Sequence, residues 1–215
     1  MTKDIACLQQ KRTKLEQQLA EAGQLRSLLY ETGSPLEQAV RDALILFGFS
    51  VKTYKESDSE FDVIFESSDG RLIGEVEGKD NRAITIEKLD QLERNLREDF
   101  ARDEVSEFAK GVLFGNSKRL TPPSERGETF TAKCMTASKR SGIALVCTTD
   151  MYGPARYLRE TIDPSYASAC RKAILGTAGN IVVFPLRPRS LPRKGSLQNQ
   201  VHRQSTVSDR NEAPG

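Results

Sequence analysis

Hydrophobic residues recur at intervals of three and four along segment 3–30, which contains no proline. The recurring apolar positions are Ile5, Leu8, Leu15, Leu19, Ala22 and Leu29. This spacing predicts a long helix with an apolar seam that Arg12 and Arg26 interrupt. The seam packs either on its own domain or on a partner helix as a short coiled coil. We favour a partner protein or a second copy of the chain, because glutamine and lysine dominate the other faces.

A different pattern follows Glu31. Ser34 and Pro35 are typical of a helix start, and an apolar stripe then runs to Gly48. Alternating residues flank the turn 67–70, which predicts a β-hairpin. The expected strands are 51–54, 61–66, 71–77, 109–114, 143–147 and 181–184, and the later helices are 86–96, 129–141, 148–160 and 164–175. A hairpin followed by alternating helices and strands predicts an α/β fold with a mixed central β-sheet flanked by helices.

Composition narrows the class of protein. The chain has 215 residues, of which 37% are hydrophobic, and contains no apolar run long enough to span a membrane. The N-terminus lacks an apolar signal core, so we expect a cytoplasmic protein with reduced thiols. Its four cysteines form no Cys-x-x-Cys pair, and His202 is the single histidine. Zinc clusters and histidine-dependent hydrolases are therefore nearly excluded.

The charge is unevenly distributed. The net charge is only +2, yet residues 186–215 carry six basic and two acidic side chains. This segment is rich in Pro, Ser and Gln, and we expect a disordered basic tail that attracts polyanions. We accordingly divide the chain into an N-terminal helix (1–32), a slightly acidic α/β domain (33–185) and the tail (186–215).

The candidate chemistry lies on the predicted hairpin. Glu75, Glu77 and Lys79 alternate along one strand and therefore share a face, and the hairpin brings Asp62 towards them. Carboxylates suit a hard cation such as Mg²⁺, and the carbonyl of Gly78 could add an oxygen ligand. The competing interpretation is an ordinary solvent-facing strand edge with alternating charges.

Asp62, fourteen intervening residues and then Glu77-Gly-Lys79 resemble the motif of the PD-(D/E)xK nuclease superfamily, also called restriction-endonuclease-like. The order of elements over roughly 34–147 agrees with it. The resemblance implies a nuclease that hydrolyses DNA with Mg²⁺ or Mn²⁺. Asp62 and Glu77 would bind the metal, Lys79 would position the attacking water, and Glu75 would support the site or bind a second metal.

Two further residues match the family less specifically. Glu37 corresponds to a first-helix glutamate that joins the metal site in some branches, but Ser34 to Glu37 also reads as a capping box. Gln91 corresponds to a glutamine on the helix after the motif, where it would contact the substrate or the edge of the site.

Other features leave the function open. Basic residues in the loop 116–127 either contact phosphates or are solvated. Besides a nuclease, the sequence allows a weak or inactive nuclease-fold module that binds nucleic acid, or a protein partner through the N-terminal helix. It also allows a scaffold that assembles through that helix. A complete set of Asp62, Glu77 and Lys79 favours the nuclease.

Overall fold

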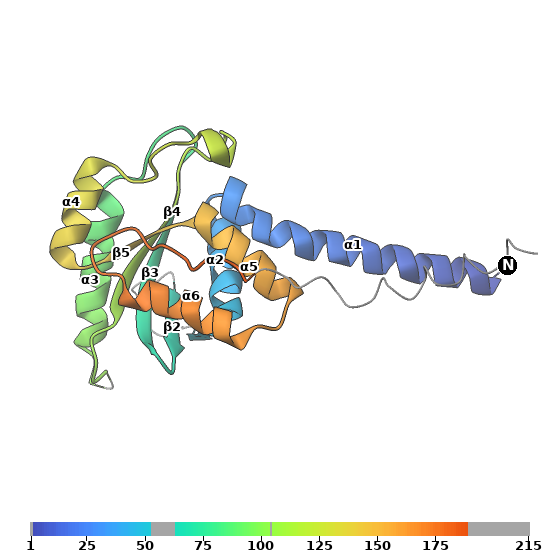
Figure 1. The fold of residues 1–215 in the computed structure, drawn as a ribbon, viewed down its shortest axis with the longest axis horizontal. Coiled ribbons are helices and arrows are strands. Elements are labelled where there is room, and N and C mark those ends of the chain that lie inside the picture. Colours follow the sequence, from blue (N-terminus) through green and yellow to red (C-terminus); the bar gives the residue numbers. More distant parts are fainter. Residues whose placement is uncertain (1, 53–62, 104, 189–215) are drawn as a thin grey trace, which may run out of the picture.

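A computed structural model describes residues 2–52, 63–103 and 105–188 of the chain (Figure 1). Its elements are α1 (Thr2–Tyr30), α2 (Gly33–Leu46), β1 (Ser50–Lys52), β2 (Val63–Ser67), β3 (Gly70–Gly78), α3 (Glu87–Phe100), β4 (Lys110–Asn116), the 3-10 helix η1 (Pro123–Glu125), α4 (Ala132–Ser141), β5 (Ala144–Cys147), α5 (Thr148–Glu160) and α6 (Pro164–Gly176). No described helix is both long and apolar enough to cross a membrane.

The described strands form one sheet in the order β1-β2-β3-β4-β5. β1, β2 and β3 pair antiparallel, whereas β3, β4 and β5 pair parallel. β3 is thus the central strand and the point at which the sheet changes from antiparallel to parallel. The fold class is confirmed: this is an α/β protein with a mixed central sheet flanked by helices.

Each face of the sheet has its own hydrophobic core. Leu72 and Val76 of β3 join the core formed with the end of α1, α2, α5 and α6. Ile73 of the same strand joins the core under α3 and α4. The alternation along β3 is therefore as expected, and odd-numbered residues from Ile73 onwards face α3. In Figure 1, α3 and α4 lie together to the left of α2 and α5.

Helix α1 belongs partly to the folded body and partly projects from it (Figure 1). Leu25 and Leu28, near its C-terminal end, are almost fully buried in the α2–α5 core. Leu8 and Leu15 lie on the projecting part and are each 65% exposed. The expected domain boundary at residue 32 lies just after the end of α1. The last two turns of α1 nevertheless pack with the rest of the fold.

Three local predictions are wrong. Helix α2 begins at Gly33 with Thr32 as its N-cap, so Ser34 does not cap it and the capping box with Glu37 is absent. The Thr32 hydroxyl instead donates to the carbonyl of Gly78. The last expected strand is a single bridge between Leu145 and Ile181, because the following residues leave the sheet and Phe184 packs against Phe47. Helix α4 begins at Ala132, since Thr131 caps it through the backbone N–H of Cys134.

Candidate active site

Glu77 and Lys79 form an ion pair at the C-terminal end of β3. Their side chains are 16% and 24% exposed, respectively, so the pair is open to solvent on one side. The main chain here is fixed by β4: the N–H of Lys79 donates to the carbonyl of Asn116, and the carbonyl of Lys79 accepts from the N–H of Arg119. The motif thus stands at the hydrogen-bonded end of the central strand.

Glu75 lies two residues before Glu77 on the same face and is completely buried. Asn95 Nδ2 donates to its Oε1 at 2.8 Å, and Gln91 Nε2 donates to the same oxygen at 3.3 Å. Lys88 Nζ lies 3.4 Å from Oε2. A buried carboxylate on the central strand with three polar partners rules out the interpretation of this strand as a solvent-facing edge.

The partners of Glu75 all come from one stripe of α3. Lys88, Gln91 and Asn95 are three and four residues apart, which places them on the same face of the helix. The sequence pattern predicts a site role for Gln91 but not for Lys88 or Asn95. Their signal is a polar stripe at helical spacing, lying beside the buried apolar positions Leu89, Leu92 and Leu96.

Gly78 connects the site strand to the start of α2. Its carbonyl accepts from Thr32 Oγ1 at 3.3 Å. A side chain at this position would collide with Thr32, because a Cβ there would lie 2.5 Å from its Oγ1. Glu37 is half-buried in α2, which covers the opposite face of the sheet from Glu75 and Glu77. The part of Glu37 in a metal site stays a prediction.

Asp62 lies outside the described residues. Val63, to which it is joined, pairs with Gly74, the residue before Glu75. In the described part of the chain, no group of three or more His, Cys, Asp or Glu side chains is arranged to hold a metal ion. The carboxylate oxygens of Glu75 and Glu77 are of the type that Mg²⁺ prefers, and the metal site expected with Asp62 stays a prediction.

The basic residues of the loop after β4 all make contacts within the fold. Arg126 is 4% exposed and donates to the carbonyls of Thr121, Leu29 and Arg119 and to Asn116 Oδ1. Burial lowers its pKa from the ordinary value. Arg119 pairs with Asp80 and Lys118 donates to the carbonyl of Arg126.

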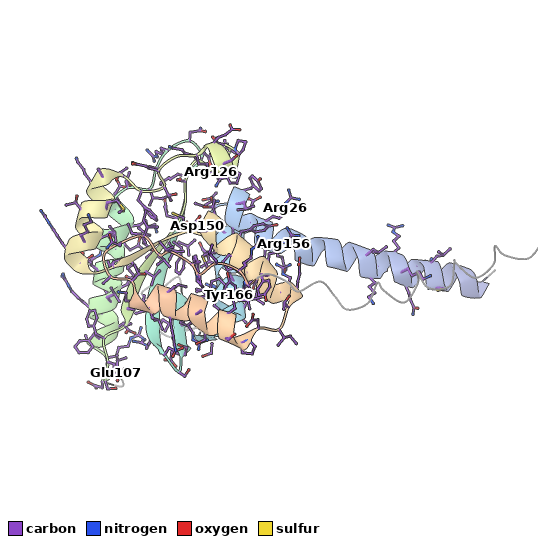
Figure 2. All side chains as sticks on the ribbon, viewed as in Figure 1. Arg26, Glu107, Arg126, Asp150, Arg156 and Tyr166 are labelled. Carbon is purple, nitrogen blue, oxygen red and sulfur yellow. The ribbon has the colours of Figure 1, made fainter. Side chains whose placement is uncertain are left out.

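Arg126 and Arg119 also hold the C-terminal end of α1, and Figure 2 labels Arg126 beside that end. The last carbonyls of a helix lack partners inside it. The carbonyls of Leu28, Leu29 and Tyr30 at the end of α1 accept hydrogen bonds from the side chains of Thr148, Arg126 and Arg119, respectively. The carbonyl of Glu31, just after the helix, accepts one from Asn116. Two of these donors are arginines, whose charge is favourable at a helix C-terminus.

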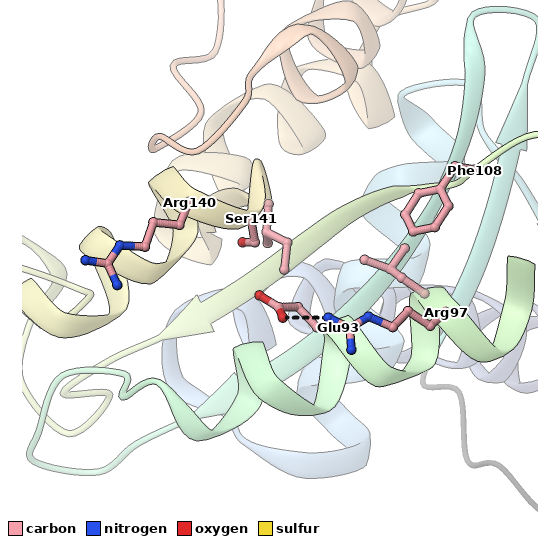
Figure 3. Close-up of a pocket in the computed structure, with 7 residues that line it drawn as sticks. Glu93, Arg97, Phe108, Arg140 and Ser141 are labelled. Atoms are coloured by element: carbon pink, nitrogen blue, oxygen red, sulfur yellow. Dashed lines mark ion pairs between the residues drawn. The ribbon is translucent and has the colours of Figure 1, made fainter.

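A surface pocket of about 400 Å³ lies elsewhere, between the C-terminal halves of α3 and α4 (Figure 3). Phe108 and Ile143, which line it, precede β4 and β5, whereas Glu77 lies at the C-terminal end of the parallel strand β3. Glu93 and Arg97 form an ion pair on its wall. The pocket is therefore at the opposite end of the sheet from the candidate site.

Comparisons with known proteins add one finding. No protein-family model and no curated protein matches the sequence. Among solved structures, the restriction endonuclease FokI is similar over 74% of this chain and 30% of its own chain, with a TM-score of 0.49 and 11% identity. The matched region thus spans less than a third of that endonuclease.

Proposed function

We propose that this protein is a metal-dependent nuclease that hydrolyses DNA phosphodiester bonds. The observation that carries the proposal is the Glu77–Lys79 ion pair on the central strand, with the buried Glu75 on the same face and Asp62 one residue before β2. Two hydrogen bonds fix this strand end. The N–H of Lys79 donates to the carbonyl of Asn116 in β4, and the hydroxyl of Thr32, the residue before α2, donates to the carbonyl of Gly78.

In this proposal Asp62 and Glu77, with the carbonyl of Gly78, hold Mg²⁺ or Mn²⁺. When bound, the ion lowers the pKa of a water ligand and offsets negative charge on the phosphate. Lys79 orients the attacking water, and Glu77 keeps the ammonium of Lys79 beside that position. Water adds to phosphorus, one P–O ester bond breaks, and the products are a phosphate end and a hydroxyl end.

Cleavage of linear and supercoiled DNA with Mg²⁺ or Mn²⁺ tests the proposal. Asp62→Ala, Glu77→Gln and Lys79→Ala are each expected to lower the rate at least about hundredfold, because each removes a group that acts on the reacting atoms. Lys172→Ala is the matched control, since Lys172 is exposed on α6 behind the other face of the sheet. Equal cleavage by all five proteins, wild type included, would refute the mechanism.

A second candidate function is a nuclease-fold module without activity that binds through α1. The observation in its favour is the projecting part of α1, on which Leu8 and Leu15 are exposed one heptad apart. Removal of the whole helix is a poor test, because Leu25 and Leu28 belong to the core. Leu8→Glu with Leu15→Glu spares the core and should convert an oligomer to a monomer in light scattering. An unchanged molar mass of this variant would contradict assembly through the helix.

A further inference from the structure

Contacts between β3 and α3 show that the two elements run in opposite directions. Arg71, at the start of β3, binds Asp99 near the end of α3 through two hydrogen bonds of 2.5 Å. Glu75, four residues further along β3, is bound by Asn95, four residues further back along α3. Each step forward along the strand is therefore a step back along the helix, towards its N-terminus.

This arrangement places Lys88 level with the end of the site strand. Lys88 lies seven residues before Asn95, which is about 10 Å along a helix. Glu77 and Lys79 lie about 7 Å and 13 Å beyond Glu75 along a strand. At this distance from the Glu75–Asn95 contact, Lys88 lies opposite the stretch of chain between Glu77 and Lys79. It lies on the face of the sheet from which Glu77 projects.

The stripe on α3 also becomes more open in the same direction. Asn95 is 8% exposed, whereas the side chain of Lys88 is 30% exposed. Asn95 and Gln91 both donate to Oε1 of Glu75, while Lys88 reaches Oε2 only at 3.4 Å and donates to Gln91 Oε1 at 3.0 Å. Glu75 therefore keeps two amide donors when the ammonium of Lys88 turns towards solvent.

We infer that Lys88 is a substrate-binding residue of this site, which takes a phosphate of the DNA strand next to the one that reacts at Lys79. The inference rests on the proposed function. An ammonium on a flexible four-carbon stem is a compact point charge that suits a phosphate. It also supplies positive charge on the carboxylate face, where the basic residues of the loop after β4 are occupied within the fold.

The test separates binding from cleavage by working in the Asp62→Ala protein. Fluorescence anisotropy measures its affinity for a labelled duplex over a series of salt concentrations. Adding Lys88→Gln should weaken binding and reduce the slope of log affinity against log salt by about 1, because one phosphate contact is lost. Lys88→Arg should restore the slope, and Lys172→Gln should leave it unchanged.

Each outcome has a distinct meaning. If Lys88 is purely structural, Lys88→Gln will lower stability but will have the same salt slope as the parent protein. This result would overturn the inference. Cleavage by the wild type would still support the proposed nuclease activity. Failure of the wild type to cleave or bind DNA would overturn the proposed function and the inference with it. Lys88→Gln keeps an amide that can bind Glu75, so its fold should be maintained.

Discussion

Asn95 Nδ2 donates a 2.8 Å hydrogen bond to Glu75 Oε1, and both side chains are withdrawn from solvent. A buried carboxylate needs donors, since an unpaired charge in the interior is costly. Asn95 supplies the shortest of the described hydrogen bonds to Glu75, and so α3 is fixed to the strand that carries the candidate site.

Asn95→Ala should lower the free energy of unfolding by about 1–3 kcal/mol, because it leaves Glu75 with a missing donor in the interior. Urea denaturation measures the change. The matched control is Arg94→Ala, whose side chain is exposed on the same helix and whose effect should stay within about 0.5 kcal/mol. Equal stability of the two variants would contradict this account of Glu75.

Arg126→Gln should lower the free energy of unfolding by about 3 kcal/mol or more, since several buried acceptors lose a charged donor together. Arg140→Gln is the control, because Arg140 is exposed at the end of α4. Thermal and urea unfolding would both report the difference. A loss below about 1 kcal/mol would show that water replaces the guanidinium at little cost.

Gly78→Ala should destabilise the protein and lower any nuclease activity together. The new Cβ would lie 2.9 Å from the backbone Cα of Thr32, so either the start of α2 or the strand end with Glu77 and Lys79 must shift. Gly153→Ala provides the contrast, because nothing lies within 4 Å of a Cβ there and alanine favours the helix α5. It should stabilise the fold by about 0.5–1 kcal/mol. The prediction fails if both substitutions are stabilising.

Stability should fall at alkaline pH. Burial raises the pKa of the Cys134, Cys147 and Cys170 thiols from 9.0 to about 11. Between these values the unfolded chain loses thiol protons that the folded chain retains, so the folded state binds more protons and stability decreases as pH rises from about 9 to 11. Urea unfolding in reductant at several pH values measures the slope. Cys134→Ala should make the slope less steep, and an unchanged slope would refute the assignment.

Much of this fold follows from local patterns in the sequence. The β2–β3 hairpin, the alternation along β3 and the apolar stripe of α3 are all encoded within short segments, and the structure confirms each. The N-cap of α2 was misplaced for a physical reason. Thr32 begins the helix because Gly78 and Thr32 meet across the fold, and no local pattern contains that contact.

The same limit applies to the candidate site. Glu75, Glu77 and Lys79 could be found because they alternate on one strand. The contacts of Lys88 and Asn95 with Glu75 could not be predicted, since no local pattern shows that α3 lies over Glu75. Arg126 was expected to be either solvated or bound to phosphate, and it is instead buried among main-chain carbonyls from distant parts of the chain.

The fastening of α1 has a mechanical consequence. The carbonyls of residues 28 to 31, where the helix enters the body, all accept side-chain donors, so bending the chain there would break hydrogen bonds. Residues 7 to 25 extend about 27 Å at the rise of an α-helix. A partner bound near residue 7 would therefore lie about 27 Å from these hydrogen bonds and from the folded body.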